Sequence, residues 1–120
     1  MIIITGGVLL IILGIFHATF WNLYDWDTEL SNLSQDNENL VQMMNICTIC
    51  YLLFTGTILL ICRSDIVNSR VGKLLLLSLS LFFVVRFILE FLFPDGSLWL
   101  GGVLLFLVLI FAIPVLRKNS

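Results

Sequence analysis

The sequence has 120 residues, of which 60% are hydrophobic and 12% charged, and its formal net charge is −2. Soluble globular domains carry about 25% charged residues, so this composition, with a mean hydropathy of +1.11, excludes an ordinary soluble protein. The basic residues are spread over a connection, the tail and an apolar run instead of forming one patch, so no nucleic-acid partner is expected.

Four apolar runs of about 20 residues, the length that crosses a bilayer, occupy most of the chain. They are residues 1–21, 41–62, 74–93 and 98–116. Only two connections have any length, which leaves no room for a soluble domain. The sequence therefore predicts an all-α integral membrane protein. Its single membrane domain, residues 1–120, is expected to be a four-transmembrane-helix bundle with antiparallel neighbours and short loops.

The first run is expected to be a retained membrane helix, not a cleaved signal peptide. It has no basic n-region and no small-x-small cleavage site, because His17 and Thr19 flank Ala18. Gly7 and Gly14 lie nearly in line on this helix, and His17 lies within about 80° of that line at 100° per residue. Since small residues mark close helix contacts in membranes, His17 is expected to face the bundle.

The connection 22–40 is acidic and contains no basic residue; its carboxylates are Asp25, Asp27, Glu29, Asp36 and Glu38. Five acids could suggest calcium, but their spacing does not fit the EF-hand loop, so no metal site is expected there. A zinc site is not expected either, because four ligands are needed and the chain has one histidine. We expect no cofactor.

The middle of the acidic connection has two interpretations. Apolar residues recur at helical spacing and could form the buried face of a short interfacial helix: Trp26, Leu30 and Leu33. The alternative is a solvated loop. Ser34 or Asp36 is a candidate N-cap for an extension of the second membrane helix.

The basic residues outside the apolar runs predict the orientation of the chain in the membrane. These residues are Arg63, Arg70, Lys73, Arg117 and Lys118. Because Lys and Arg stay on the cytoplasmic side, we expect the connection 63–73 and both termini inside, and the connection 22–40 outside. The membrane is expected to be a cytoplasmic or plasma membrane. All three tryptophans fall near the outer boundary, as an interfacial aromatic belt would: Trp21, Trp26 and Trp99.

A tight turn joins the last two runs. Pro94 cannot continue a helix, and the Asp-Gly pair after it supplies turn residues. The two helices are therefore predicted to be antiparallel neighbours. Near the cytoplasmic end, Pro114 removes a backbone hydrogen bond and predicts a local kink or fray.

Two charged residues, Arg86 and Glu90, interrupt the otherwise apolar run 74–93. A charge in a membrane helix costs about 2.5–3.5 kcal/mol on insertion scales unless it is paired or hydrated, so it marks a functional site. Glu90 follows Arg86 by one turn and can accept two of the five guanidinium N–H groups.

Five polar residues from three helices fall within about 10 Å of the predicted outer boundary, at 1.5 Å per residue. They are His17, Gln42, Asn45, Arg86 and Glu90. We predict that they form one hydrogen-bonded network, centred on Arg86 and open to the outside, which binds a ligand. In the alternative, Arg86 snorkels to lipid phosphate as an anchor, His17 is a packed histidine and Asn45 links two helices.

This polar layer predicts a binding or accessory protein of unknown specific activity. Its partners would be the lipid bilayer and a lipid head group, a small ligand, a membrane protein or a second copy of the chain. The alternative is an oligomeric transporter of ions or small molecules that uses Arg86, Glu90 and His17, although the inner half offers no matching polar path. An enzyme at the outer leaflet, with His17 or Glu90 as base and Arg86 as stabiliser, is less favoured.

The pair Cys47-x-x-Cys50 resembles the active-site spacing of quinone-linked disulfide enzymes. It lies inside a helix and not at a helix N-terminus, where thiolates are stabilised, and Cys62 is at the opposite end. The pair also lies about 140–200° around the helix from Asn45. Packed or lipid-facing cysteines are therefore favoured over a redox site.

Overall fold

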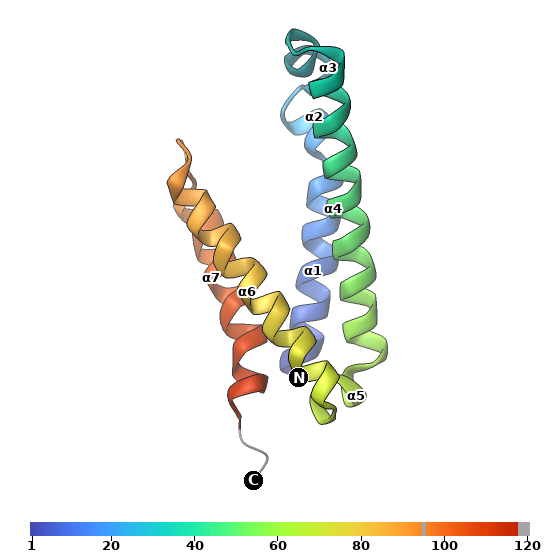
Figure 1. Cartoon of the computed structure of the whole chain (residues 1–120), viewed down its shortest axis with the longest axis vertical. Helices are drawn as coiled ribbons and strands as arrows, with labels where there is room; N and C mark the ends of the chain where they lie inside the picture. Colours follow the sequence, from blue (N-terminus) through green and yellow to red (C-terminus); the bar gives the residue numbers. More distant parts are fainter. Residues whose placement is uncertain (95, 118–120) are drawn as a thin grey trace. The chain divides into compact units, whose positions relative to one another are not determined.

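The computed structural model describes residues 1–94 and 96–117, and all regular structure in these residues is helical (Figure 1). The chain divides into two compact units. Residues 7–60 form the N-terminal unit, and residues 61–120 together with residues 1–6 form the C-terminal unit. Each unit is described by itself, and a single membrane domain stays a prediction.

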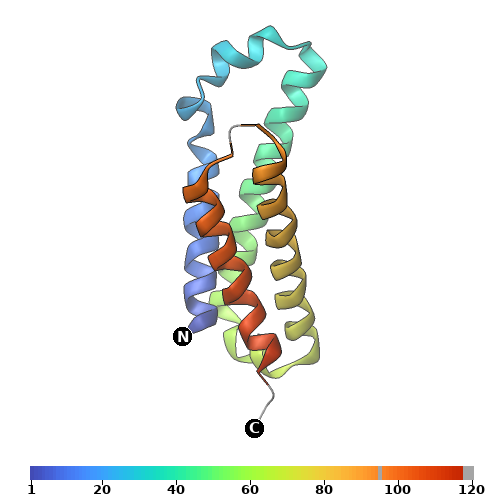
Figure 2. The ribbon, with the colours of Figure 1, turned by 90° about the vertical axis from the view of Figure 1, so that its left-hand side faces the viewer.

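The N-terminal unit contains most of two long antiparallel helices that pack side by side (Figure 1). Figure 2 shows the acidic connection that joins their ends. Its elements are α1 (Ile2–Ala18), α2 (Phe20–Leu23), α3 (Trp26–Glu29), the 3-10 helix η1 (Leu30–Asn32) and α4 (Gln35–Ile61). The backbones of α1 and α4 approach closely at Gly7 and Gly56. A Cβ added to Gly56 would lie only 2.7 Å from the carbonyl oxygen of Gly7, so this contact requires glycine.

Helix α4 begins at Gln35, six residues earlier than the predicted run 41–62, and it ends at Ile61. Ser34 caps this extension: its hydroxyl accepts a hydrogen bond from the Asn37 amide at 3.4 Å, and its carbonyl accepts from Glu38 at 2.9 Å. The helix has 27 residues and is about 40 Å long, which exceeds the roughly 30 Å hydrocarbon core of a bilayer. The predicted connection 22–40 is shortened accordingly.

Helix α1 ends at Ala18 and not at Trp21. The hydroxyl of Thr19 donates to the carbonyl of Phe16 at 2.6 Å, and after this break the chain continues into α2. The 17 residues of α1 lie at the lower end of the range of about 17–25 residues that spans a bilayer.

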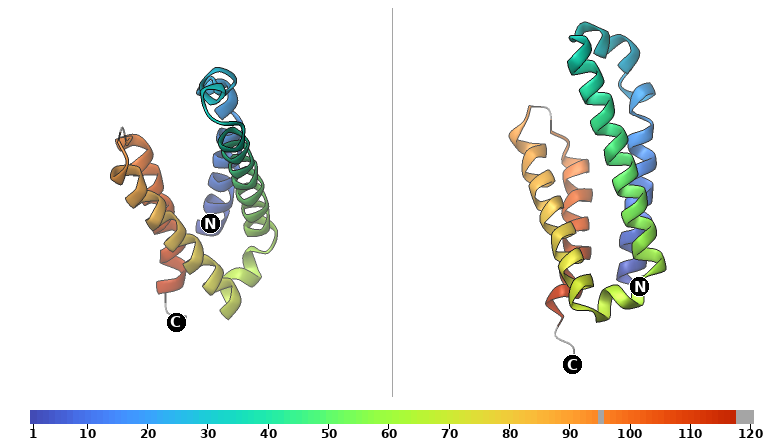
Figure 3. Two further views of the ribbon diagram at one scale, coloured as in Figure 1. Left: turned by 45° about the horizontal axis from the view of Figure 1, so that its top comes forward. Right: turned by 45° about the vertical axis from the view of Figure 1, so that its right-hand side comes forward.

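The C-terminal unit contains α5 (Arg63–Asn68), α6 (Arg70–Leu92) and α7 (Leu98–Leu116). Helices α6 and α7 lie side by side and antiparallel, as the tight turn predicts (Figures 1 and 3). Their packing involves the Ser80 hydroxyl, which donates to the Val108 carbonyl at 3.1 Å. The rings of Phe83 and Phe111 stack with centroids 6.0 Å apart.

Helix α6 begins at Arg70, four residues before the predicted run 74–93, and it ends at Leu92. The early start is explained by Ser69, whose hydroxyl accepts from the Gly72 amide at 2.9 Å as an N-cap. The connection 63–73 is not a plain loop, because it contains α5.

The bounds of α7 agree with the predicted run 98–116, and the helix continues past Pro114 to Leu116. No fray therefore occurs at Pro114. The turn after Phe93 includes Asp95, which lies outside the described residues, as does Lys118 at the C-terminus.

Three helices within the described ranges are long and apolar enough to cross a membrane, namely α4, α6 and α7. Helix α1 is a shorter apolar helix. These lengths and compositions indicate an integral membrane protein.

Candidate functional site

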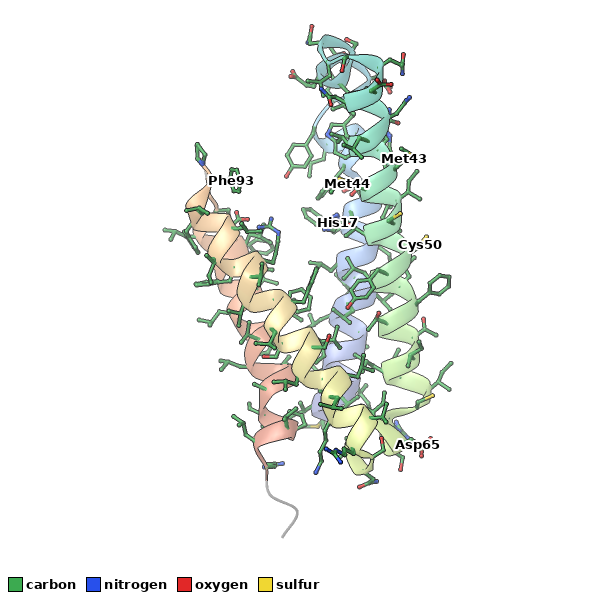
Figure 4. All side chains as sticks on the ribbon, in the orientation of Figure 1. His17, Met43, Met44, Cys50, Asp65 and Phe93 are labelled. Atoms are coloured by element: carbon green, nitrogen blue, oxygen red, sulfur yellow. The ribbon has the colours of Figure 1, made fainter. Side chains whose placement is uncertain are left out.

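Asn45 and His17 join α4 to α1 through two hydrogen bonds. The side-chain oxygen Oδ1 of Asn45 lies 3.0 Å from Nδ1 of His17, and its Nδ2 donates to the main-chain oxygen of His17 at 3.0 Å. Asn45 is buried, with 7% of its surface exposed. The His17 ring, labelled in Figure 4, also packs on Phe20 with centroids 4.4 Å apart. Both ends of the Asn45 amide are thus used to hold the two helices together.

Gln42 extends this link by one turn of α4. Nε1 of Trp21 donates to Oε1 of Gln42 at 3.2 Å, and Nε2 of Gln42 donates to Oε1 of Glu38 at 3.3 Å. The residues joined by the hydrogen bonds of Asn45 and Gln42 are together called the amide clasp, which consists of His17, Trp21, Glu38, Gln42 and Asn45. Trp21 and Glu38 were not expected to take part in a polar network with Gln42.

The segment for which a short helix or a loop was expected folds as two short helical pieces, α3 and η1, beside a group of aromatic rings. The Trp26 ring lies 5.2 Å from that of Trp21 and 5.9 Å from that of Phe20, measured between centroids. Asp25, with φ of 45°, adopts the left-handed conformation just before α3, which a few aspartates tolerate. Leu30 is buried, whereas Leu33 is exposed, so the predicted apolar face is only partly formed.

Arg86 and Glu90 form an ion pair on α6, as their spacing predicts. Nη1 of Arg86 lies 2.8 Å from Oε2 of Glu90. The other carboxylate oxygen, Oε1, accepts the backbone N–H of Ser97 at 2.8 Å. Ser97 is the N-cap of α7, and its hydroxyl accepts from the Leu100 amide at 3.3 Å. Glu90 therefore ties the start of α7 to Arg86.

The ion pair lines a pocket of about 340 Å³ near the end of α6, called the Arg86 pocket. Its described lining residues are Arg86, Leu89, Glu90, Phe93, Pro94 and Gly96, and Phe93 is labelled in Figure 4. The side chain of Arg86 is 42% exposed, whereas that of Glu90 is only 10% exposed. Glu90 is thus held in place, while the guanidinium keeps most of its five N–H donors for other partners.

The structure gathers the five predicted site residues into two sets, one in each unit. His17, Gln42 and Asn45 belong to the amide clasp, and the other two residues form the ion pair. One network that joins all five stays a prediction. Ser97 was missed, although a serine directly before an apolar run is a recognisable N-cap signal. Nothing in the sequence signals that its N–H reaches Glu90.

The two cysteines of the C-x-x-C pair, Cys47 and Cys50, are free and exposed. Figure 4 shows Cys50 on the side of α4 that faces away from α1. No group of three or more His, Cys, Asp and Glu side chains that could hold a metal ion occurs among residues 1–94 and 96–117.

Comparisons with protein-family models, with curated proteins and with solved structures give no match. The amide clasp uses matched donors and acceptors to hold helices together. The Arg86 pocket instead presents an exposed cation beside a fixed carboxylate and apolar side chains, which suits binding of a ligand with polar and apolar parts.

Proposed function

We propose that this protein crosses the membrane four times and has a binding or accessory role, with a polar ligand held in the Arg86 pocket. The first helix would be the fourth span, at the short end of the usual range. Both termini and the connection 63–73 would be cytoplasmic, because basic residues stay on that side. The acidic connection and the α6–α7 turn would then lie outside, with Trp21, Trp26 and Trp99 as the aromatic belt.

The observation that carries the binding role is the way Glu90 holds Arg86. One carboxylate oxygen of Glu90 is fixed by the Ser97 amide and the other by the guanidinium, each at 2.8 Å. Arg86 stays charged at any relevant pH, and its exposed donors favour a ligand with an anionic group. Arg86 precedes the end of α6 at Leu92 by about 9 Å, which is within reach of lipid head groups or a small extracellular ligand.

Single-cysteine labelling tests the four spans and their orientation. In a variant whose three native cysteines are replaced by alanine, Ser31→Cys in the acidic connection should react with an impermeant maleimide on intact cells. Ser64→Cys in α5 should react only after the cells are permeabilised. A tag at the N-terminus that is accessible from outside would show that α1 does not span, and labelling of Ser64→Cys on intact cells would contradict the orientation.

Native mass spectrometry from mild detergent tests the binding role. The wild type should carry a bound lipid or small molecule, and Arg86→Met should lose it because the guanidinium is its anionic partner. Arg63→Met, which removes an exposed arginine of α5, is the matched control and should keep the ligand. A wild type without ligand, or an Arg86→Met variant with unchanged ligand, would contradict the proposal. Ion flux in proteoliposomes that Glu90→Gln abolishes would favour the transporter instead.

A further inference from the structure

We infer that the ligand of the Arg86 pocket is the phosphoethanolamine head group of a zwitterionic lipid, with its phosphate on Arg86 and its ammonium on Glu90. This inference rests on the proposed function of the same pocket. It follows from the charges that line the pocket, from the hydrogen bonds that fix Glu90, and from the apolar residues around the pair.

The charges of the described lining residues cancel, since Arg86 and Glu90 are the only ionised side chains among them and their charged atoms lie 2.8 Å apart. A simple anion on Arg86 would therefore sit close to the carboxylate of Glu90 and be repelled by it. Near a membrane this repulsion is weakly screened, because the effective dielectric constant is low. A ligand with one anionic and one cationic group avoids it, because the four charges can alternate and sum to zero.

Glu90 is suited to bind the cationic group of such a ligand. Its carboxylate cannot turn away, because Oε1 accepts from the Ser97 amide and Oε2 from Arg86. Each carboxylate oxygen can still accept a second hydrogen bond. A primary ammonium brings three N–H donors for these positions, whereas the trimethylammonium of choline brings none. The pocket should therefore prefer ethanolamine to choline.

The rest of the lining favours a lipid over a soluble ester of the same head group. Leu89 and Phe93, which line the pocket beside the charged pair, expose 37% and 65% of their surface. Apolar side chains next to a polar site can cover the glycerol backbone and the first carbons of an acyl chain. A soluble phosphoethanolamine ester would gain only the polar part of this contact.

A lipid titration by native mass spectrometry tests the inference. Delipidated protein in detergent is titrated with phosphatidylethanolamine, phosphatidylcholine and phosphatidylglycerol that share the same acyl chains. Phosphatidylethanolamine should bind about tenfold more tightly than either of the others. Soluble glycerophosphoethanolamine should compete only at a concentration about 100-fold above that of the lipid.

Substitutions distinguish the role of the Arg86 charge from that of the Glu90 charge. Glu90→Gln keeps an oxygen for the Ser97 amide but loses the negative charge, so it should lose the preference for phosphatidylethanolamine and bind phosphatidylglycerol at least as tightly. Glu38→Gln removes a carboxylate of the amide clasp and should keep the preference. Arg86→Met should lose all three lipids. Circular dichroism and gel filtration show whether each variant is folded.

The outcomes distinguish the inference from the proposed function. If the wild type binds none of the lipids, the inference fails; if the protein as purified also carries no ligand, the proposed function fails with it. Equal binding of all three, tightest binding of phosphatidylglycerol, or a preference that survives in folded Glu90→Gln overturns the inference alone. If soluble glycerophosphoethanolamine competes at concentrations similar to that of the lipid, the result contradicts a lipid as the source of the head group. The wild-type series needs no variant, so it decides the question even if Glu90→Gln misfolds.

Discussion

The two units fasten their helix pairs with different chemistry. In the N-terminal unit, two hydrogen bonds of 3.0 Å between Asn45 and His17 join α4 to α1, and the Trp21 indole of α2 donates to the Gln42 side-chain oxygen of α4 at 3.2 Å. In the C-terminal unit, the last turns of α6 meet α7 through the charged Glu90 and the Ser97 amide at 2.8 Å. Asn45 is 7% exposed, but the Arg86 side chain is 42% exposed. An amide can be satisfied by one neighbour, whereas a guanidinium has donors to spare for a ligand.

The two helix pairs also differ in how closely their backbones approach each other. Helices α1 and α4 meet backbone to backbone at Gly7 and Gly56, so the atom nearest to a Cβ added at Gly56 is a carbonyl oxygen that no side-chain rotation can move. In α7, a Cβ added to Gly101 would lie 2.5 Å from Cζ of Phe91, which is the end of a side chain and can shift, and one added to Gly102 would have no atom within 4 Å. The α1–α4 contact is thus the less tolerant of added volume.

The largest expected effect comes from Gly56→Ala. The added methyl group would lie 2.7 Å from the Gly7 carbonyl oxygen and 2.8 Å from Ile11 Cγ1, so the helices must separate. We expect a loss of about 2–3 kcal/mol in the free energy of unfolding, measured by thermal or detergent-induced unfolding. Gly102→Ala is the control and should be neutral. Equal stability of the two variants would show that the helices do not need this close approach.

A smaller effect is expected from Asn45→Leu, which removes both hydrogen bonds of Asn45 to His17. Interhelical hydrogen bonds in membranes contribute about 0.6 kcal/mol on average and at most about 1.7, so we expect a loss of about 1–2 kcal/mol in unfolding free energy. Gln42→Leu should cost less, because Trp21 lies near the predicted outer boundary, where water can replace the lost acceptor. If Gln42→Leu lost more unfolding free energy than Asn45→Leu, the Trp21–Gln42 hydrogen bond would be the more important one in the amide clasp.

The smallest change in stability is expected from Arg86→Met. Because the Arg86 side chain is 42% exposed, we expect it to contribute as much as in a surface ion pair, about 0.2–1 kcal/mol. The melting temperature in detergent should therefore fall little and match that of Arg63→Met. The same measurement tests the predicted network of five residues. If Arg86 were buried among polar partners, removing it would cost about 3–5 kcal/mol, and a loss of that size would favour the shared network over a pocket that faces outward.

The sequence was sufficient to predict the elements whose signals are local. The bounds of α7 follow from the apolar run and from Pro94, which cannot continue the preceding helix. The pairing of Arg86 with Glu90 follows from helical spacing. The start of α4 at Gln35 agrees with Ser34 as the predicted N-cap of an extension, whereas α6 begins at Arg70, before the predicted run. Hydropathy marks the apolar part of a helix, whereas a serine cap sets its first residue.

The contacts between elements could not be predicted in the same way. The Trp21–Gln42 hydrogen bond depends on the break at Thr19, which turns α2 relative to α1. The contact of Ser97 with Glu90 depends on how tightly the chain turns after Phe93. Both are set by backbone geometry over a few residues, which composition and periodicity do not record.

The orientation of the Asn45 amide also determines which nitrogen of His17 carries a proton. Because Nδ2 of Asn45 donates to the His17 carbonyl, Oδ1 faces the imidazole and must accept from Nδ1–H. The neutral ring is therefore the Nδ1-protonated tautomer, and its basic nitrogen is Nε2. In an imidazolium ring both nitrogens carry a proton, so the Nδ1–H donor to Oδ1 is the same in either charge state. Helices α1 and α4 can thus stay joined at this point whether His17 is neutral or charged.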